Sequence, residues 1–152
     1  MRALILSLGI LIALVSGASA NWEYARWGMT PEQVAAASKG MVKALPANAR
    51  TTIAAANLRF AASGTHKDGN LLLDLRFSFD ATTNGLACVS YAVRDSAQNA
   101  LLKDTLIKRY GPPQSQGGLP AIGLEEISWT KPDEITLMIT NGERSTVLHC
   151  MP

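Results

Sequence analysis

The stretch that decides the fold runs from Leu71 to Val93 and reads LLLDLRFSFD-ATTNG-LACVSYAV. Between Leu71 and Asp80 apolar and polar residues alternate, and a period of two is typical of a strand with one buried face and one solvent-facing face. Asn84 and Gly85 both tolerate a positive φ, so the segment between the two apolar runs predicts a turn. We therefore expect residues 71–80 and 86–93 to form a β-hairpin.

A helical pattern follows this hairpin and runs from Ser96 to Tyr110. Its apolar residues share one broad face, and they are Ala100, Leu102, Leu106, Ile107 and Tyr110. Polar residues occupy the opposite face of the same helix. We expect this helix to cover the apolar face of the hairpin.

The first twenty residues have the organisation of a secretory signal peptide. Arg2 supplies a short positive region, residues 3–15 are apolar, and residues 16–20 read SGASA, which ends in an A-x-A-like cleavage signal. Cleavage before Asn21 would leave 152 − 20 = 132 residues, enough for one domain over residues 21–152. An uncleaved anchor is the alternative, but the apolar run is short for a bilayer span. No cysteine stands at the cleavage point, so we expect a soluble exported protein without a lipid anchor.

The charge of the chain is nearly balanced. The formal net charge of +2 includes Arg2, so the mature chain is close to +1. Nucleic acids and anionic membranes are bound by clustered Lys and Arg, and the sequence shows no such cluster. These two classes of partner are therefore disfavoured, and stable membrane insertion is not expected.

Cys88 and Cys150 are the two cysteines of the chain. Export places them in an oxidising compartment, so the sequence predicts a disulfide between the returning strand of the hairpin and the C-terminal segment. Closing a loop of about sixty residues contributes on the order of 4 kcal/mol in the chain-entropy model. The alternative is a reactive or metal-binding thiol, but there is no C-x-x-C spacing, and we expect no metal site.

The best local signal for a helix start is the octapeptide WGMTPEQV, residues 27–34. Thr30 is a good N-cap, Pro31 suits the first helical position, and Gln33 can complete a capping box. Gly40 can end the helix in a left-handed conformation, so we expect a helix from Pro31 to residue 38 or 39.

This octapeptide resembles the opening of small, mostly uncharacterised exported proteins of Gram-negative bacteria, in which W-G-M-[ST]-P-E-[EQ]-V begins the mature chain. Further similar segments are FSFD at residues 77–80, LACV at 86–89 and LIKRYGP at 106–112, before Trp129. Residues 28–34 are also similar to a helix start in accessory lipoproteins of the outer-membrane β-barrel assembly machinery. The chain lacks the lipidated cysteine of that second group and the Leu-Gly-x-Pro that follows its helix. The resemblance implies a periplasmic location and supplies no catalytic residue.

The remaining segments supply the other expected strands of the sheet and the connections between them. We expect residues 41–56 to be a connection with a short strand from Thr51, residues 58–63 to be a strand, and residues 64–69 to be a polar turn. Residues 111–123 are rich in Gly and Pro and predict an irregular surface loop. Three further strands are expected at residues 126–130, 135–140 and 144–150, with a tight Asn141–Gly142 turn. The prediction is an α+β fold, an antiparallel sheet of two meanders with two helices packed on one face.

Catalytic chemistry is hard to assemble from these residues. His66 lies in the predicted polar turn and His149 beside a predicted disulfide, so both fit a structural role better than that of a general base. Asp74 and Asp80 share one strand face with Arg76, which favours an ordinary charge-compensated surface over paired catalytic carboxylates. There is no G-x-S-x-G elbow or phosphate-binding glycine motif, and we expect no cofactor.

Binding is the better-supported role at this stage. Trp22 and Tyr24 lie near a free N-terminus, where exposed aromatic residues often mark an interface, while Trp27 and Trp129 are expected in the core. Gln114 and Gln116 lie in the predicted loop 111–123. We expect a non-enzymatic periplasmic protein that binds an envelope component or partner protein through these two segments. The alternatives are a small hydrolase or ligand-binding enzyme with a cleft under loop 111–123, and an inhibitor of a host or competitor hydrolase.

Overall fold

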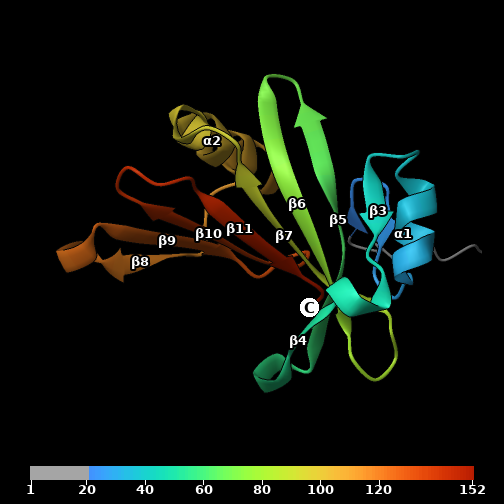
Figure 1. The fold of residues 1–152 in the computed structure, drawn as a ribbon. Coiled ribbons are helices and arrows are strands. Elements are labelled where there is room, and N and C mark those ends of the chain that lie inside the picture. The colour runs from blue at the N-terminus through green and yellow to red at the C-terminus, as the bar shows by residue number, and fades with distance from the viewer. Residues whose placement is uncertain (1–20) are drawn as a thin grey trace, which may run out of the picture.

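The structure is a computed structural model that describes residues 21–152. The predicted signal peptide, residues 1–20, lies outside the described residues. The described chain has an α+β fold with a nine-stranded antiparallel open sheet, two α-helices and one disulfide (Figure 1). The predicted fold class is confirmed.

The sheet consists of two meanders that meet in its middle. Its strands, in spatial order, are β3 (Val42–Ala44), β5 (Leu58–Asp68), β6 (Leu71–Asp80), β7 (Leu86–Val93), β11 (Thr146–Cys150), β10 (Glu134–Thr140), β9 (Leu124–Trp129) and β8 (Ser115–Leu119). The short strand β4 (Thr51–Ile53) also pairs with β5. A separate two-stranded pair, β1 (Asn21–Trp22) and β2 (Ala25–Arg26), opens the described chain. The last strand of the second meander therefore lies beside the last strand of the first.

The alternation in β6 matches its burial. Leu71, Leu73, Leu75, Phe77 and Phe79 are buried, and the residues between them are half-buried or exposed. Their neighbours on the same face include Val89 and Tyr91 of β7, Val147 of β11 and Ile135 of β10, so one apolar layer extends across both meanders. This face is the covered face, and the opposite one, which includes Asp74, Arg76 and Ser90, is the open face.

Helix α1 (Pro31–Ala37) has the predicted N-terminus. Thr30 Oγ1 accepts a hydrogen bond from the Gln33 backbone N–H, and the Gln33 side chain accepts one from the Thr30 N–H, which completes the capping box. The helix buries Val34 against the core and contacts β3 and β5. Lys39 and Gly40 follow with positive φ values of 53° and 92°, as expected for a left-handed helix end.

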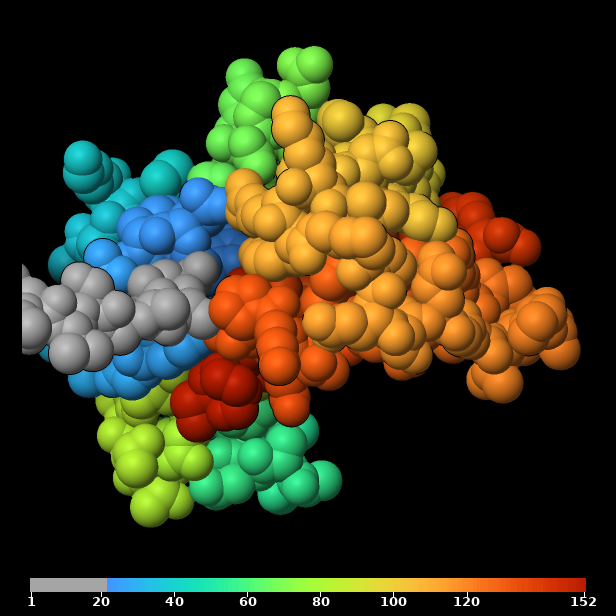
Figure 2. All heavy atoms as spheres, turned by 180° about the vertical axis from the view of Figure 1, so that it is seen from behind, coloured from blue at the N-terminus to red at the C-terminus, as the bar shows by residue number. Residues whose placement is uncertain are grey.

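Helix α2 (Asn99–Tyr110) follows a short 3₁₀ turn, η3 (Ser96–Gln98). It buries Leu102 and Leu106 in the same core as Val34, so both helices cover one face. Figure 2, seen from behind, shows the N-terminal segment in blue and α2 with the segment after it in yellow and orange on this side. By crossing the covered face, α2 carries the chain from β7 in the middle of the sheet to β8 at its edge. None of the helices in residues 21–152 is long and apolar enough to cross a bilayer.

Three predicted connections differ in the structure. The polar turn expected at residues 64–69 is mostly strand, because β5 continues to Asp68 in register with β6 and the chain reverses only at Gly69 and Asn70. The expected irregular loop 111–123 contains β8 and a 3₁₀ turn, η4 (Pro120–Ile122), because residues 115–119 pair with β9. The turn at Asn141–Gly142 belongs to a longer connection between β10 and β11 and not to a tight two-residue hairpin.

Candidate functional site

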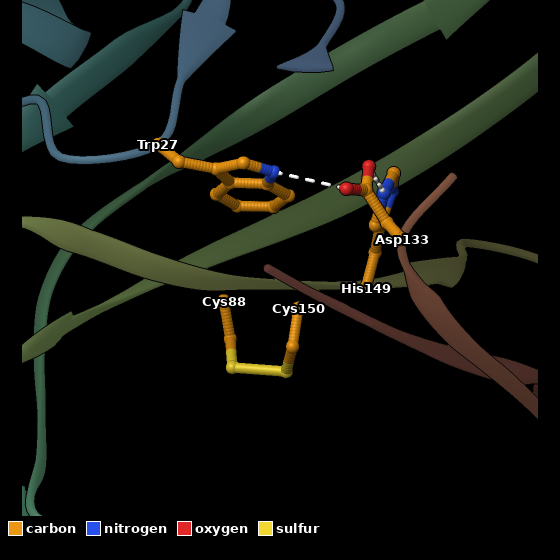
Figure 3. The surroundings of a disulfide bond; sticks show 5 residues. All are labelled: Trp27, Cys88, Asp133, His149 and Cys150. Carbon is orange, nitrogen blue, oxygen red and sulfur yellow. Dashed lines mark hydrogen bonds and ion pairs between the residues drawn. A yellow bond between two sulfur atoms is a disulfide. The ribbon is translucent and has the colours of Figure 1, made fainter. Parts of the chain in front are cut away.

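The disulfide joins the two meanders at their contact. Cys88 of β7 and Cys150 of β11 are directly opposite in register, and their sulfurs are bonded on the open face of the sheet (Figure 3). The predicted pairing is confirmed, at a sequence separation of 62. A structural disulfide is consistent with an oxidising compartment.

A buried polar cluster lies on the other side of the same strands. His149 Nε2 is 2.7 Å from Asp133 Oδ2, and the Trp27 indole N–H donates to Asp133 Oδ1 at 3.1 Å (Figure 3). The three residues come from β11, from the turn between β9 and β10 and from the segment after β2. The cluster therefore connects three separate parts of the chain on the covered face of the sheet.

Burial sets the electrostatics of this cluster. It lowers the pKa of His149, and hydrogen bonding and charge at Asp133 oppose that shift. The imidazole lies edge-on to Trp27 and Tyr110, and its Nδ1 has no partner among the described residues. The side chains of His149 and Asp133 are each only 1 % exposed, so no substrate reaches the pair. This arrangement supports the fold and differs from an open catalytic dyad.

Asp133 orients the His149 ring, a contact that the sequence did not predict. One sequence signal was available. His149 and Val147 alternate with Leu148, which places His149 on the apolar side of its strand. Asp133 gave no comparable signal, since aspartate in a Pro-Asp turn is usually exposed.

The histidines and aspartates that could form a hydrolase active site do not lie together in the structure. His66 is opposite Leu73 on the covered face of the sheet, whereas Asp74 is on the open face of β6. His149 is also on the covered face and is paired with Asp133. Neither histidine lines the surface hollow beside β8. An active site made of either histidine with Asp74 or Asp80 is therefore not formed.

The N-terminal aromatic segment is folded onto the core. Trp22 is only 3 % exposed and lies edge-on to Tyr24, His66 and Phe77, so its predicted exposure is wrong. The β1–β2 pair turns the chain back over the sheet, which buries this large apolar ring. Tyr24 is half-buried, and burial raises its pKa to about 12. Trp129 is buried as expected, while Trp27 is half-buried at the polar cluster.

An ion-pair clasp holds this segment in place. Arg109 of α2 contacts Glu23 at 2.7 Å and Asp68 of β5 at 3.0 Å. The clasp lies at the rim of a water-sized cavity of about 20 Å³ beneath Trp22 and Tyr91. A cavity of this volume is too small for an organic ligand.

The 111–123 segment remains the exposed part of the predicted binding region. Gln114 is a structural residue, because its side-chain oxygen accepts hydrogen bonds from the backbone N–H and hydroxyl of Thr130. Gln116 is exposed on β8, and every residue of β8 is exposed. A hollow of about 460 Å³ lies beside this strand, and it is lined by Gly117, Gly118, Pro120, Gly123, Leu124 and Glu125.

Comparisons with protein-family models, with curated protein sequences and with solved structures gave no match to this chain. Within residues 21–152 no three His, Cys, Asp or Glu side chains are grouped closely enough to hold a metal ion. The edge strand β8 and the turn that follows it are therefore described as a candidate recognition site from their geometry alone.

Proposed function

We propose that this protein is a non-enzymatic exported protein of the periplasm that binds an envelope partner protein, taking an extended segment of that partner as an added strand beside β8. The observation that carries the proposal is an unprotected sheet edge. Among the strands of residues 21–152, β8 pairs with β9 alone, and all five of its residues are exposed. The free N–H and C=O groups of such an edge are a template for another strand.

The composition of β8 supports this role. Its residues, SQGGL, contain no charge and no proline, which are the usual devices that keep sheet edges from pairing. A side chain at Gly117 would meet open space, so a partner backbone can approach closely there. Gly118 has φ +143°, and a Cβ at this position would collide with the carbonyl oxygen of Leu124. The shape of the edge therefore depends on glycine.

Two apolar side chains next to this edge provide contacts beyond the backbone. Leu119 is 59 % exposed and Ile122 is 63 % exposed, the highest values among the large hydrophobic residues described. In strand addition the backbone bonds supply affinity and side-chain contacts supply specificity. We infer that apolar side chains of the partner contact Leu119 and Ile122.

The opposite edge of the sheet is protected. It is formed by β3 and β4, which have three residues each, and the chain between them contains Pro46 and a 3₁₀ turn, η1 (Ala47–Ala49). Lys43 lies within β3, and Arg50 precedes β4 and pairs with Glu32. Short strands, proline and charge all disfavour strand addition. The difference between the protected β3–β4 edge and the unprotected β8 edge thus supports binding at β8.

The test compares matched variants in affinity capture. The purified exported chain should enrich a partner from periplasmic extract, and Leu119→Lys with Ile122→Lys should abolish that enrichment. The control is Met41→Lys with Ile53→Lys, which changes two hydrophobic residues of similar exposure near the opposite edge. Circular dichroism should show that both double variants are folded, because all four positions are exposed. Recovery of the same proteins by both double variants would contradict the proposal.

Hydrogen exchange then tests the mode of binding. Added strand pairing should slow amide exchange in residues 115–119 when the captured partner is bound, because those amides acquire acceptors. Protection confined to residues away from β8 would show a different interface.

If the captured partner is a hydrolase and loses activity in the complex, the inhibitor alternative is the correct description of the same surface. That alternative is favoured by one feature, the pairing of residues 115–119 with β9, which holds the segment in place.

A further inference from the structure

A second surface, on the open face of the sheet, has the chemistry of an anion site. A groove of about 410 Å³ lies over β6, β7 and β11, away from β8. Its polar lining consists of Asp74 and Arg76 of β6, Ser90 of β7, Thr146 of β11 and Arg144. The volume lies within the range of small-molecule sites.

Asp74 organises the arginines around the groove. Arg94 Nε donates to Asp74 Oδ1 at 2.7 Å, and Arg144 Nη1 donates to Asp74 Oδ2 at 3.2 Å. One carboxylate is therefore shared by two guanidinium groups. The third, that of Arg76, lies 5.1 Å from the centre of the Phe60 ring, a cation–π contact that orients it. The guanidinium groups of Arg76 and Arg144 thus line the groove together with one carboxylate, and that of Arg94 pairs with the same carboxylate.

These groups retain many unused donors. A guanidinium has five N–H groups, and the bonds to Asp74 use one each from Arg94 and Arg144. The side chains of Asp74, Arg94 and Arg144 are about half exposed. Their ion pairs therefore contribute little to stability and can rearrange around a ligand. The hydroxyls of Ser90 and Thr146 add neutral donors in the same groove.

We propose that this groove binds the phosphate group of a small phosphate monoester. Arg76 and Arg144 line the groove with Asp74, and Arg94 pairs with that aspartate, so these four side chains together carry two excess positive charges, which favours an anion such as a phosphate monoester with a charge of about −1.5 to −2. The charged donors that line the groove come from β6 and from the connection before β11, and the hydroxyls of Ser90 and Thr146 come from β7 and β11. A phosphate offers three terminal oxygens to such donors, whereas a carboxylate offers two oxygens in one plane.

The occupant of this groove is independent of the partner at β8. The groove uses side chains of the middle strands, and strand addition uses the backbone of the edge strand. Variants of Leu119 and Ile122 should leave phosphate binding unchanged, and variants of the arginines should leave partner capture unchanged. Failure of one proposal is thus distinguishable from failure of the other.

The first test is calorimetric titration of the purified chain with inorganic phosphate at low ionic strength. Arg76→Gln and Arg144→Gln should each weaken phosphate binding by about tenfold or more, because each removes charge-assisted hydrogen bonds. Arg26→Gln is the matched control, since Arg26 is exposed on β2 and does not line the groove. Equal affinity in all three variants, or no phosphate binding by the unmodified chain, would overturn the proposal.

A second variant and a second anion sharpen the result. Asp74→Asn should bind phosphate more tightly, because it removes the negative charge and releases donors of Arg94 and Arg144. Succinate should bind more weakly than phosphate under the same conditions. Tighter binding of succinate would assign the groove to carboxylates, and weaker phosphate binding by Asp74→Asn would show that phosphate does not lie beside these arginines. Either outcome contradicts the phosphate assignment.

Discussion

The two faces of the sheet use the same strands in opposite ways. On the covered face, polar groups such as Asp133 and His149 are nearly inaccessible and bond to fixed partners within the chain. On the open face, Asp74 and the arginines around it are about half exposed and pair only with one another. Alternation along a strand assigns neighbouring residues to these two environments. Consequently, side chains one position apart differ in whether they stabilise the fold or remain available to a ligand.

Adjacent residues of β6 give the largest test of this difference. Phe77 is fully buried on the covered face, so Phe77→Ala should lower the free energy of unfolding by about 3–5 kcal/mol. Arg76 is its exposed neighbour on the open face, and Arg76→Ala should change the stability by about 0.5 kcal/mol or less. Urea unfolding followed by circular dichroism measures both. Similar losses for the two variants would show that the open face is also a stabilising surface.

The disulfide is the structural element of the open face that should matter most for stability. Cys88→Ala with Cys150→Ala should lower the free energy of unfolding by about 2–4 kcal/mol, because the link closes a long loop in the unfolded chain. Reductant should cause a similar loss in the unmodified protein and none in the double variant, which controls for effects of the reductant itself. An unchanged urea midpoint in the double variant would show that strand pairing alone holds the two meanders together.

The sequence predicted the parts of the fold that have strong local signals. Alternation in residues 71–80, the capping box at Thr30 and the pairing of Cys88 with Cys150 are all confirmed. Residues 115–119 were assigned to a loop because two glycines weaken any strand signal, and their pairing depends on the distant β9. Strand pairing with a partner remote in sequence thus overrode local composition.

The candidate sites depended on contacts that no local pattern contains. Trp22 was expected to be exposed because it is near the mature N-terminus, but the β1–β2 pair places it against Phe77 and His66. The groove on the open face is lined by Arg76 and by Arg144, which is distant along the chain, and Arg94 pairs with Asp74 beside them. The alternation along β6 predicts that Asp74 and Arg76 share one strand face, but no local pattern brings Arg94 and Arg144 beside them.

The smallest expected effect concerns pH and the buried histidine of the covered face. The unfolded chain protonates histidine near the ordinary pKa of about 6.5, whereas burial lowers the pKa of His149 in the folded state. Between these two values the unfolded state binds more protons, so stability should fall as the pH falls below about 6.5 and level off below the folded-state pKa. The slope from this one group is at most about 1.4 kcal/mol per pH unit.

The range from pH 7 to pH 5 isolates this contribution. Hydrogen bonds lower the pKa values of Glu32 and Asp80, so the stability that these groups contribute is lost only below about pH 4. Burial raises the pKa of Tyr110, which keeps its hydroxyl neutral beside the imidazole throughout this range. Urea unfolding of His149→Gln should therefore show a flatter pH dependence than the unmodified protein. An unchanged slope in His149→Gln would mean that the covered face does not exclude the charged imidazole.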